Sequence, residues 1–249
     1  NSTLHCCVQL WPSRFEGVTL AEAKKLMGTI MEPIPAEKMS TEETLPKSSI
    51  PSSFDSRQQW PNCVTPIRNQ GQCGSCWAFG AAESFSDRLC IASGGQTSIV
   101  LSPEQLVSCD WEGNMGCNGG IPHLAWDYFE AFGIVSDSCF PYSAGTGSAP
   151  KCAKTCADGQ PWTTHKTKLF STKGYSGVEA IQTAIMTSGP VEGTISVYKD
   201  FMSYTSGVYE HTTGDYLGGH AIRMVGWGTE NGTDYWLVAN SWGTTWGEE

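Results

Sequence analysis

The sequence predicts an α+β protein with two lobes, in which a helical lobe is followed by a β-rich lobe and a cleft lies between them. Two observations support this prediction. Apolar residues recur with helical spacing in the first half of the chain, whereas short segments of β-branched, aromatic and small residues follow Pro190, separated by glycine-rich turns. The length of 249 residues allows one large domain or two small ones, with enough chain for a buried core.

Helical spacing and capping residues predict four helices in the folded part, over residues 76–89, from 102 onward, over about 122–132 and from 176 to 189. Ser102 and Pro103 are typical of the N-cap and first turn of the second helix. Three short strands are predicted after them, at residues 191–197, 220–226 and 235–239. The order of these elements, helices first and strands second, is the basis for the two lobes.

Residues 1–53 differ from the rest of the chain in their sequence pattern. A capping-box pattern at Thr19–Glu22 predicts the start of a short helix, and Gly28 is placed to end it. Beyond it, prolines interrupt a run with no clear period, at Pro33, Pro35, Pro46 and Pro51. The pattern leaves two interpretations open, a flexible terminal tail or a propeptide made of a helical anchor and an extended strap. We assign residues 1–49 as the propeptide and 50–249 as the folded domain.

The composition excludes several classes of protein. The chain has 25 acidic and 15 basic residues, and its net charge of −10 argues against nucleic acids or anionic membranes as the main partner. Aromatic residues make up 11% of the chain and charged residues only 16%, which is unlike a disordered sequence. No apolar run approaches the roughly 18 residues that a transmembrane helix needs, so no membrane span is expected.

The cysteine content points to an oxidising compartment. A count of 11 cysteines favours a disulfide framework on the secretory route, and because the number is odd, at least one thiol stays free within the chain. A signal peptide is expected to have been removed or to lie outside this sequence. Asn1 and Asn231 each begin an N-x-Thr tripeptide and are candidate glycosylation sites.

The segment from Gln70 to Phe79 is the most informative. It places Cys76 at the start of a helix, where partial positive charge and free N–H groups stabilise a thiolate. A thiolate paired with an imidazole that protonates the leaving group is a catalytic nucleophile. Cys73 and Cys76 also form a C-x-x-C, the spacing of redox dithiols and of half a zinc site. The segment alone leaves all three possibilities open.

Two later residues favour nucleophilic catalysis. His220 precedes a predicted strand and Asn240 follows another, and each taken singly is commonly structural. Together with Cys76 they provide a thiol, an imidazole and an amide whose oxygen can hold the ring tautomer. These three segments, the first of them Gln-Gly-Gln-Cys-Gly-Ser-Cys-Trp from Gln70, resemble the papain-like cysteine proteases.

Further motifs are similar to the cathepsin B branch of this family, over nearly the whole chain. They are Phe54-Asp55-Ser56-Arg57, Gly116–Gly120, Gly189–Gly193 and Asp234–Trp236. The resemblance implies a papain-like two-lobe fold with a helical left lobe, a β-barrel-like right lobe and the active site between them. It also implies a cysteine-type endopeptidase that is made as a zymogen and needs no metal or other cofactor.

By the same resemblance, Cys76 is the nucleophile, His220 the general acid and base, and Asn240 the residue that orients His220. Gln70 forms the oxyanion hole together with the backbone N–H of Cys76. Trp242 shields the contact between Asn240 and His220 from water. The residues expected to bind substrate are Gly119 and Gly120 through their backbone, and Ile121, Pro122, Thr194 and Ala221 as the lining of the pocket for the second residue before the scissile bond.

The resemblance also sorts the cysteines. It implies four disulfides, Cys63–Cys90, Cys73–Cys117, Cys109–Cys152 and Cys139–Cys156, and leaves Cys76 free. Cys6 and Cys7 have no counterparts in the family. With Cys73 bonded elsewhere, the C-x-x-C is disfavoured as a dithiol or a zinc ligand pair. The alternatives to a protease are a catalytically impaired binding protein with the same fold and, less favoured, a thiol–disulfide oxidoreductase.

Two departures from the cathepsin B pattern matter. Relatives carry a long occluding insertion with two adjacent histidines that bind the C-terminal carboxylate of a substrate, whereas the segment Cys139–Cys156 is short and has no histidine. We therefore expect cleavage within chains, and no removal of C-terminal dipeptides. The sequence also ends at Glu249, ahead of further strands in relatives, so we expect these C-terminal strands to be missing from the β lobe.

The expected partners follow from the same resemblance. They are protein and peptide substrates, the propeptide as an inhibitor, and cystatin-like inhibitors, with the protein itself a monomer. The resemblance places the protein in the secretory pathway, in a lysosome or lysosome-like vacuole, or outside the cell.

Overall fold

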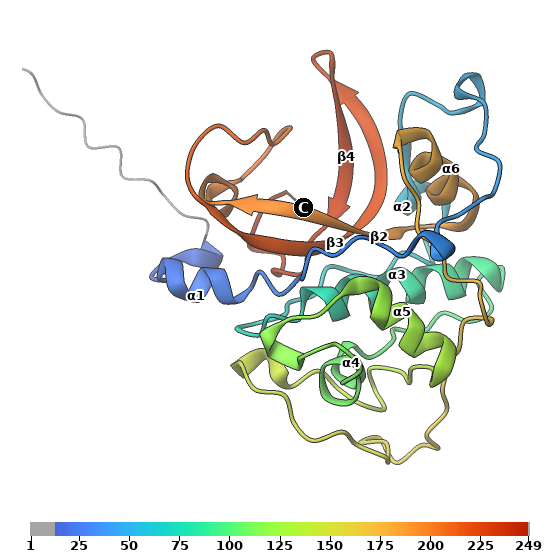
Figure 1. Ribbon diagram of the computed structural model, residues 1–249, viewed down its shortest axis with the longest axis vertical. Helices are drawn as coiled ribbons and strands as arrows, with labels where there is room; N and C mark the ends of the chain where they lie inside the picture. Colours follow the sequence, from blue (N-terminus) through green and yellow to red (C-terminus); the bar gives the residue numbers. More distant parts are fainter. Residues whose placement is uncertain (1–12, 249) are drawn as a thin grey trace, which may run out of the picture.

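The computed structural model describes residues 13–248. The candidate glycosylation site Asn1 and the two cysteines Cys6 and Cys7 lie outside this part of the chain. Three helices form one lobe, α3 (Cys76–Ala92), α4 (Pro103–Cys109) and α5 (Pro122–Ala131). A sheet with further short helices forms the other lobe, and the two lie side by side (Figure 1). This is the helical lobe followed by a β lobe that the sequence predicts.

The β lobe is built on four antiparallel strands, β1 (Phe54–Asp55), β2 (Val191–Tyr198), β3 (Tyr216–Glu230) and β4 (Thr233–Ala239). The long strand β3 pairs with each of the other three. It extends beyond the predicted residues 220–226 because the glycines near its ends lie within the strand. A Cβ at Gly226 would come within 2.0 Å of the carbonyl oxygen of Phe54, so glycine is what lets β1 approach β3 here.

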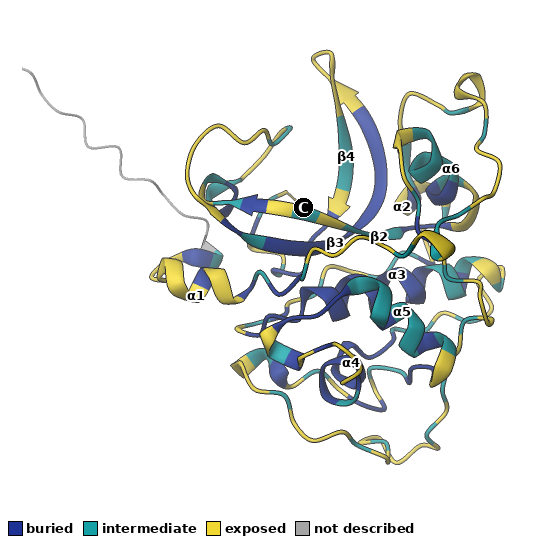
Figure 2. Cartoon of the chain, viewed as in Figure 1, coloured by how far each residue is buried: buried dark blue, intermediate teal, exposed yellow. Residues whose placement is uncertain are grey.

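Helix α3 lies at the interface of the lobes. It packs against α4 and α5 on one side and against β3 on the other, and it is therefore buried along most of its length (Figure 2). The burial includes charged residues. Arg223 of β3 contacts two carboxylates of α3, Asp87 at 2.6 Å and Glu83 at 3.6 Å, so an ion-pair cluster joins the two lobes.

The predicted cap of the second helix is present in the structure, whereas that of the fourth is not. Ser102 Oγ accepts a hydrogen bond from the Gln105 N–H at 3.1 Å, as its N-cap position predicts. Helix α6 (Val178–Ser188) instead begins two residues later than the predicted Ser176. Its N-cap is Gly177, whose φ of 89° is easily adopted by glycine and starts the helix without a side-chain cap.

The N-terminal segment packs against both lobes. Helix α1 (Leu20–Lys25) begins with the predicted capping box, in which Thr19 and Glu22 bond each other's backbone N–H groups. Phe15 and Leu26, on either side of this helix, are buried in a cluster of the β lobe. After α1 the chain runs along the junction of the lobes (Figure 1), so its described part is an ordered piece of the molecule.

Four disulfides hold the chain together, Cys63–Cys90, Cys73–Cys117, Cys109–Cys152 and Cys139–Cys156. Each joins two cysteines that the resemblance pairs. Over residues 13–248, Cys76 is the cysteine left free, and it is buried. Within the same range, no helix has both the length and the apolar character needed to cross a bilayer.

Candidate active site

The thiol of Cys76 lies at the N-terminus of α3, facing the β lobe. The N-cap of the helix is Ser75, whose side chain does not cap it, so the helix keeps its free N–H groups beside the thiol. The side chain of Cys76 is fully buried, and its Sγ lies 3.2 Å from Oγ1 of Thr29 in the N-terminal segment. Thr29 was not singled out by its sequence pattern.

His220 and Asn240 come from two neighbouring strands. His220 lies on β3 and Asn240 directly follows β4, so the pairing of these strands brings them together. His220 Nε2 is 2.7 Å from Asn240 Oδ1, which also accepts the backbone N–H of Ser241 at 2.7 Å. That backbone donor fixes the orientation of the amide, and an oxygen that only accepts requires the proton on Nε2. The other ring nitrogen is then free for Cys76.

Trp242 covers this pair. Its ring centroid is 4.8 Å from that of His220, and its side chain is fully buried. Phe15 packs edge-on against the same indole at 5.1 Å, so the N-terminal segment closes the site from outside. The hydrogen bond between His220 and Asn240 is therefore kept from water, where competing hydrogen bonds would weaken it.

The thiol and the imidazole change each other's proton affinity. Burial raises the pKa of Cys76, but the nearby charge of His220 and the contact with Thr29 outweigh it and lower the pKa to about 7. Burial likewise lowers the pKa of His220, yet the charge of Cys76 and the hydrogen bond to Asn240 raise it overall. The arrangement therefore favours a thiolate beside an imidazolium, which is a nucleophile next to a proton donor.

Gln70 lies on the same side of the cleft as Cys76 and is fully buried. Its Nε2 donates to the carbonyl oxygens of Leu26 at 3.0 Å and of Cys73 at 2.8 Å, while its Oε1 accepts from Ser241 Oγ at 2.8 Å. The amide thus points its N–H group at a carbonyl of the segment that passes through the cleft. An N–H group placed in this way can donate to a carbonyl oxygen in the cleft.

Gly120 binds the N-terminal segment by its backbone. Its N–H donates to the Gly28 carbonyl at 2.8 Å and its carbonyl accepts from Ile30 at 2.9 Å, while Thr29 donates to Gly219 of the opposite lobe at 3.1 Å. The segment is therefore held from both walls of the cleft. A Cβ on Gly119 would come within 2.9 Å of the Gly28 carbonyl oxygen, so Gly119 allows this approach.

A cavity of about 980 Å³ continues the cleft and is bordered by Pro122 and Thr194, as well as by residues Ile30–Ile34 of the N-terminal segment. The other two predicted lining residues, Ile121 and Ala221, are buried but do not border this cavity. Glu192 borders it and was not predicted. Its carboxylate accepts a hydrogen bond from Trp126 Nε1 at 2.8 Å, and burial raises the pKa of Glu192 well above its ordinary value.

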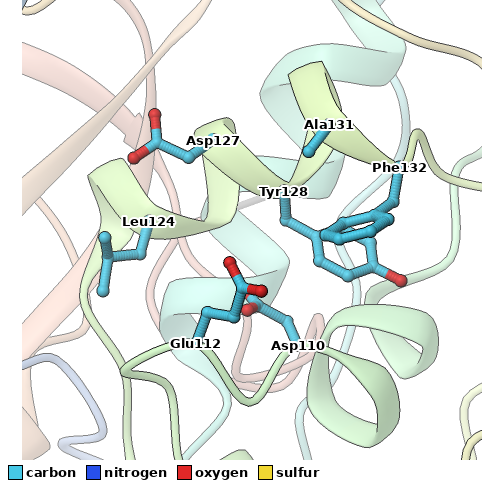
Figure 3. Close-up of a pocket in the computed structure, with 7 residues that line it drawn as sticks. All are labelled: Asp110, Glu112, Leu124, Asp127, Tyr128, Ala131 and Phe132. Atoms are coloured by element: carbon cyan, nitrogen blue, oxygen red, sulfur yellow. The ribbon is translucent and has the colours of Figure 1, made fainter.

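A second cavity, of about 130 Å³, lies on the far side of α5 and is bordered by three carboxylates (Figure 3). Its lining residues are Asp110, Glu112, Leu124, Asp127, Tyr128, Ala131 and Phe132. It shares no lining residue with the larger cavity and includes none of the predicted site residues. Among the described residues, no group of acidic, cysteine or histidine side chains has the arrangement of a metal site.

Comparisons with known proteins match this arrangement. Residues 50–249 match the family described as papain family cysteine protease. The chain is 39% identical over 275 residues to "Cathepsin B-like cysteine proteinase 5" of Caenorhabditis elegans, covering 97% of this chain and 80% of that protein. It is 44% identical over 228 residues to the "Cathepsin B-like cysteine proteinase" of Schistosoma japonicum, covering 80% of this chain and 67% of that protein.

Solved structures give the same result. The chain superimposes on "proCathepsin B S9 from Trypanosoma congolense" with a TM-score of 0.78 and 37% identity, covering 92% of this chain and 80% of that one. For digestive procathepsin L 3 of Tenebrio molitor larval midgut, the TM-score is 0.73 and the identity 28%, over 94% of this chain and 72% of that one. Both of these proteins are named as pro-forms. The chain belongs to the papain family of cysteine proteases and is cathepsin B-like.

Proposed function

We propose that Cys76, His220 and Asn240 are the catalytic residues of this cysteine protease and that residues 1–49 are its inhibitory propeptide. The observation that carries the proposal is the buried thiol at the N-terminus of α3, facing an imidazole that Asn240 holds at 2.7 Å. Opposite charges on the thiol and the ring stabilise one another, which supports an ion pair as the resting state.

The mechanism follows from this pair. The Cys76 thiolate attacks the carbonyl carbon of the scissile peptide bond, and the charge moves to the carbonyl oxygen. Gln70 Nε2 and the Cys76 backbone N–H donate to that oxygen. One such donor typically lowers the activation barrier by roughly 3–4 kcal/mol. The His220 imidazolium then protonates the leaving amine. The neutral ring next takes a proton from water, which attacks the acyl-enzyme and releases Cys76.

The inhibitory role of the N-terminal segment is supported by what it occupies. Thr29 contacts the Cys76 sulfur, and the Leu26 carbonyl accepts the hydrogen bond from Gln70 Nε2 that an oxyanion would need. Gly120, expected to bind substrate backbone, is bonded to Gly28 and Ile30 instead. A substrate cannot reach the thiol while this segment stays in place.

The catalytic assignment is tested by two substitutions in the full chain after activation by limited proteolysis. Cys76→Ala abolishes turnover because it removes the nucleophile. Asn240→Ala leaves measurable activity, since it releases the ring of His220 without removing it. Turnover that survives in Cys76→Ala, once the preparation is free of contaminating protease, would contradict the proposal.

We also propose cleavage within chains. The segment between Cys139 and Cys156 contains the short turn Ala144–Thr146, which is tied to the helical lobe: the Gly145 carbonyl accepts from the Gln72 N–H at 2.7 Å, and the Glu104 carboxylate accepts from the Ala144 N–H at 2.9 Å. Because these bonds hold the turn on the helical lobe, we infer that it does not close the end of the cleft. Internally quenched peptides with amidated C-termini should then be cleaved as well as those with free carboxylates, and a strong preference for the free acid would overturn this proposal.

The remaining partners are proposed on the family resemblance. The protein acts on proteins and peptides, is inhibited by cystatin-like proteins, and is a monomer of the secretory pathway that resides in a lysosome-like compartment or outside the cell. Asn231 lies exposed in the turn between β3 and β4, which suits a glycan. Light scattering on the purified chain tests the monomer, and the mass shift lost in Asn231→Gln tests the glycan.

A further inference from the structure

We propose that Tyr142 is a positioning residue for the oxyanion hole. Its hydroxyl joins the two segments that carry the oxyanion donors, one containing Gln70 and the other leading into Cys76. The inference rests on the oxyanion role proposed above, and the experiment below separates the failure of one from the failure of the other.

The hydroxyl of Tyr142 makes two hydrogen bonds whose direction is determined. It donates to the backbone carbonyl of Gln70 at 2.8 Å. Its oxygen is also 2.8 Å from Ser75 Oγ. A phenol has one proton, so with that proton on Gln70 the second bond must be donated by Ser75. Ser75 is the residue before Cys76, so one hydroxyl group fixes the distance between the two donor-bearing segments.

The ring of Tyr142 is itself held firmly. It packs edge-on against Phe79, with ring centroids 4.7 Å apart, and Phe79 lies one turn along α3 from Cys76. The two residues that follow Tyr142 are held by the fully buried Glu104, whose carboxylate accepts hydrogen bonds from the backbone N–H groups of Ser143 and Ala144. Burial also raises the pKa of Tyr142, so its hydroxyl keeps its proton and stays a donor. The bridge therefore has a rigid support.

Loss of the Tyr142 hydroxyl should destabilise the transition state and leave the thiolate of Cys76 unaffected. Without the hydroxyl, the Gln70 carbonyl and Ser75 Oγ lose a partner, and the two donors are no longer kept at a fixed separation. The amide of Gln70 remains bound to Ser241, so the loss is partial. The hydroxyl of Tyr142 bonds to Gln70 and Ser75 and not to Cys76 or His220, so the ion pair should keep its reactivity.

The test compares Tyr142→Phe with a matched control, Tyr128→Phe. Tyr128 is also partly buried and loses one hydrogen bond, from Gln105 Nε2 at 3.0 Å, but it lies outside the site. Each full chain is folded intact and then activated by limited proteolysis. Three quantities are measured: kcat and KM on a peptide substrate, inhibition by a peptide aldehyde, whose adduct oxygen occupies the oxyanion hole, and the rate at which iodoacetamide alkylates Cys76.

For Tyr142→Phe we expect kcat to fall about tenfold, the size expected from one lost hydrogen bond, and aldehyde binding to weaken to the same extent. KM and the alkylation rate should stay unchanged, because neither depends on an oxyanion. Tyr128→Phe should match the wild type in all of these. An unchanged kcat in Tyr142→Phe, or an alkylation rate that falls in parallel with kcat, would overturn the proposal.

Two further variants keep the test decisive. If Tyr142→Phe does not fold, Ser75→Ala removes the other half of the bridge and should lower kcat and aldehyde affinity by about threefold with unchanged alkylation; no change in kcat would overturn the proposal. Gln70→Ala tests the oxyanion role itself. If Gln70→Ala keeps full kcat, the oxyanion assignment fails; if it loses kcat while Tyr142→Phe does not, only the Tyr142 inference fails.

Discussion

Replacing Leu26 by alanine should loosen the inhibitory segment. Leu26 follows α1 directly and is fully buried in a cluster that includes Phe15 and Trp242. Truncating a buried leucine to alanine typically costs about 2–5 kcal/mol. Since tenfold in affinity corresponds to about 1.4 kcal/mol, the lower limit predicts that binding of the segment weakens at least ~30-fold.

The assay adds synthetic peptides of residues 1–49 to the activated protease and measures the inhibition constant. Leu20→Ala is the matched control, because Leu20 is the first residue of α1 but is 36% exposed and, unlike Leu26, is not part of the buried cluster around Trp242. It should change the inhibition constant by less than about threefold, the effect of an ordinary surface substitution. Equal inhibition constants for the Leu26 and Leu20 variants would refute the account of how the segment is anchored.

Three other predictions follow from the buried charges. kcat/KM should rise with pH as the Cys76 thiol ionises, at a pKa below that of a free thiol, and fall as His220 loses its proton, at a pKa above that of a free imidazole. A single ionisation at the free-thiol value would contradict the ion pair. Burial raises the pKa of Glu192 well above its ordinary value, so the stability that this group contributes falls as the pH rises above about 4.5. Glu192→Gln removes this loss and should raise the melting temperature relative to wild type more at pH 7 than at pH 4; an equal difference at both would contradict the prediction. Arg223→Met leaves Asp87 without its buried partner and should lower the free energy of unfolding by about 3–5 kcal/mol in denaturant titrations, and a loss below about 1 kcal/mol would show that the pair is dispensable.

The sequence was most informative where a residue's chemistry depends on its local element. The start of a helix at Cys76 could be predicted from apolar spacing, and the helix after Thr19 from its capping box. His220 and Asn240 are different, because nothing local distinguishes them from ordinary residues beside a strand. Only the family resemblance brought them together with Cys76, and the pairing of β3 with β4 is what places them side by side.

Contacts between distant segments could not be predicted. Tyr142 reaches Ser75 across 67 residues, and its sequence neighbourhood gives no sign of either partner. No sequence pattern marks Thr29 either, although its side chain contacts the Cys76 sulfur. Glycines misled the strand prediction at Gly226, because a close backbone approach and a turn use the same residue type. Each case depends on the tertiary fold rather than on local propensity.

The central claim is that Cys76 is an activated nucleophile covered by the N-terminal segment. Its most direct test is labelling with a peptidyl epoxide, before and after activation, followed by peptide mapping. The account predicts one label per molecule, on Cys76 alone, and only after residues 1–49 are removed, because the thiol is fully buried in the intact chain. A label on Cys73 as well, or no label on Cys76 after activation, would contradict it.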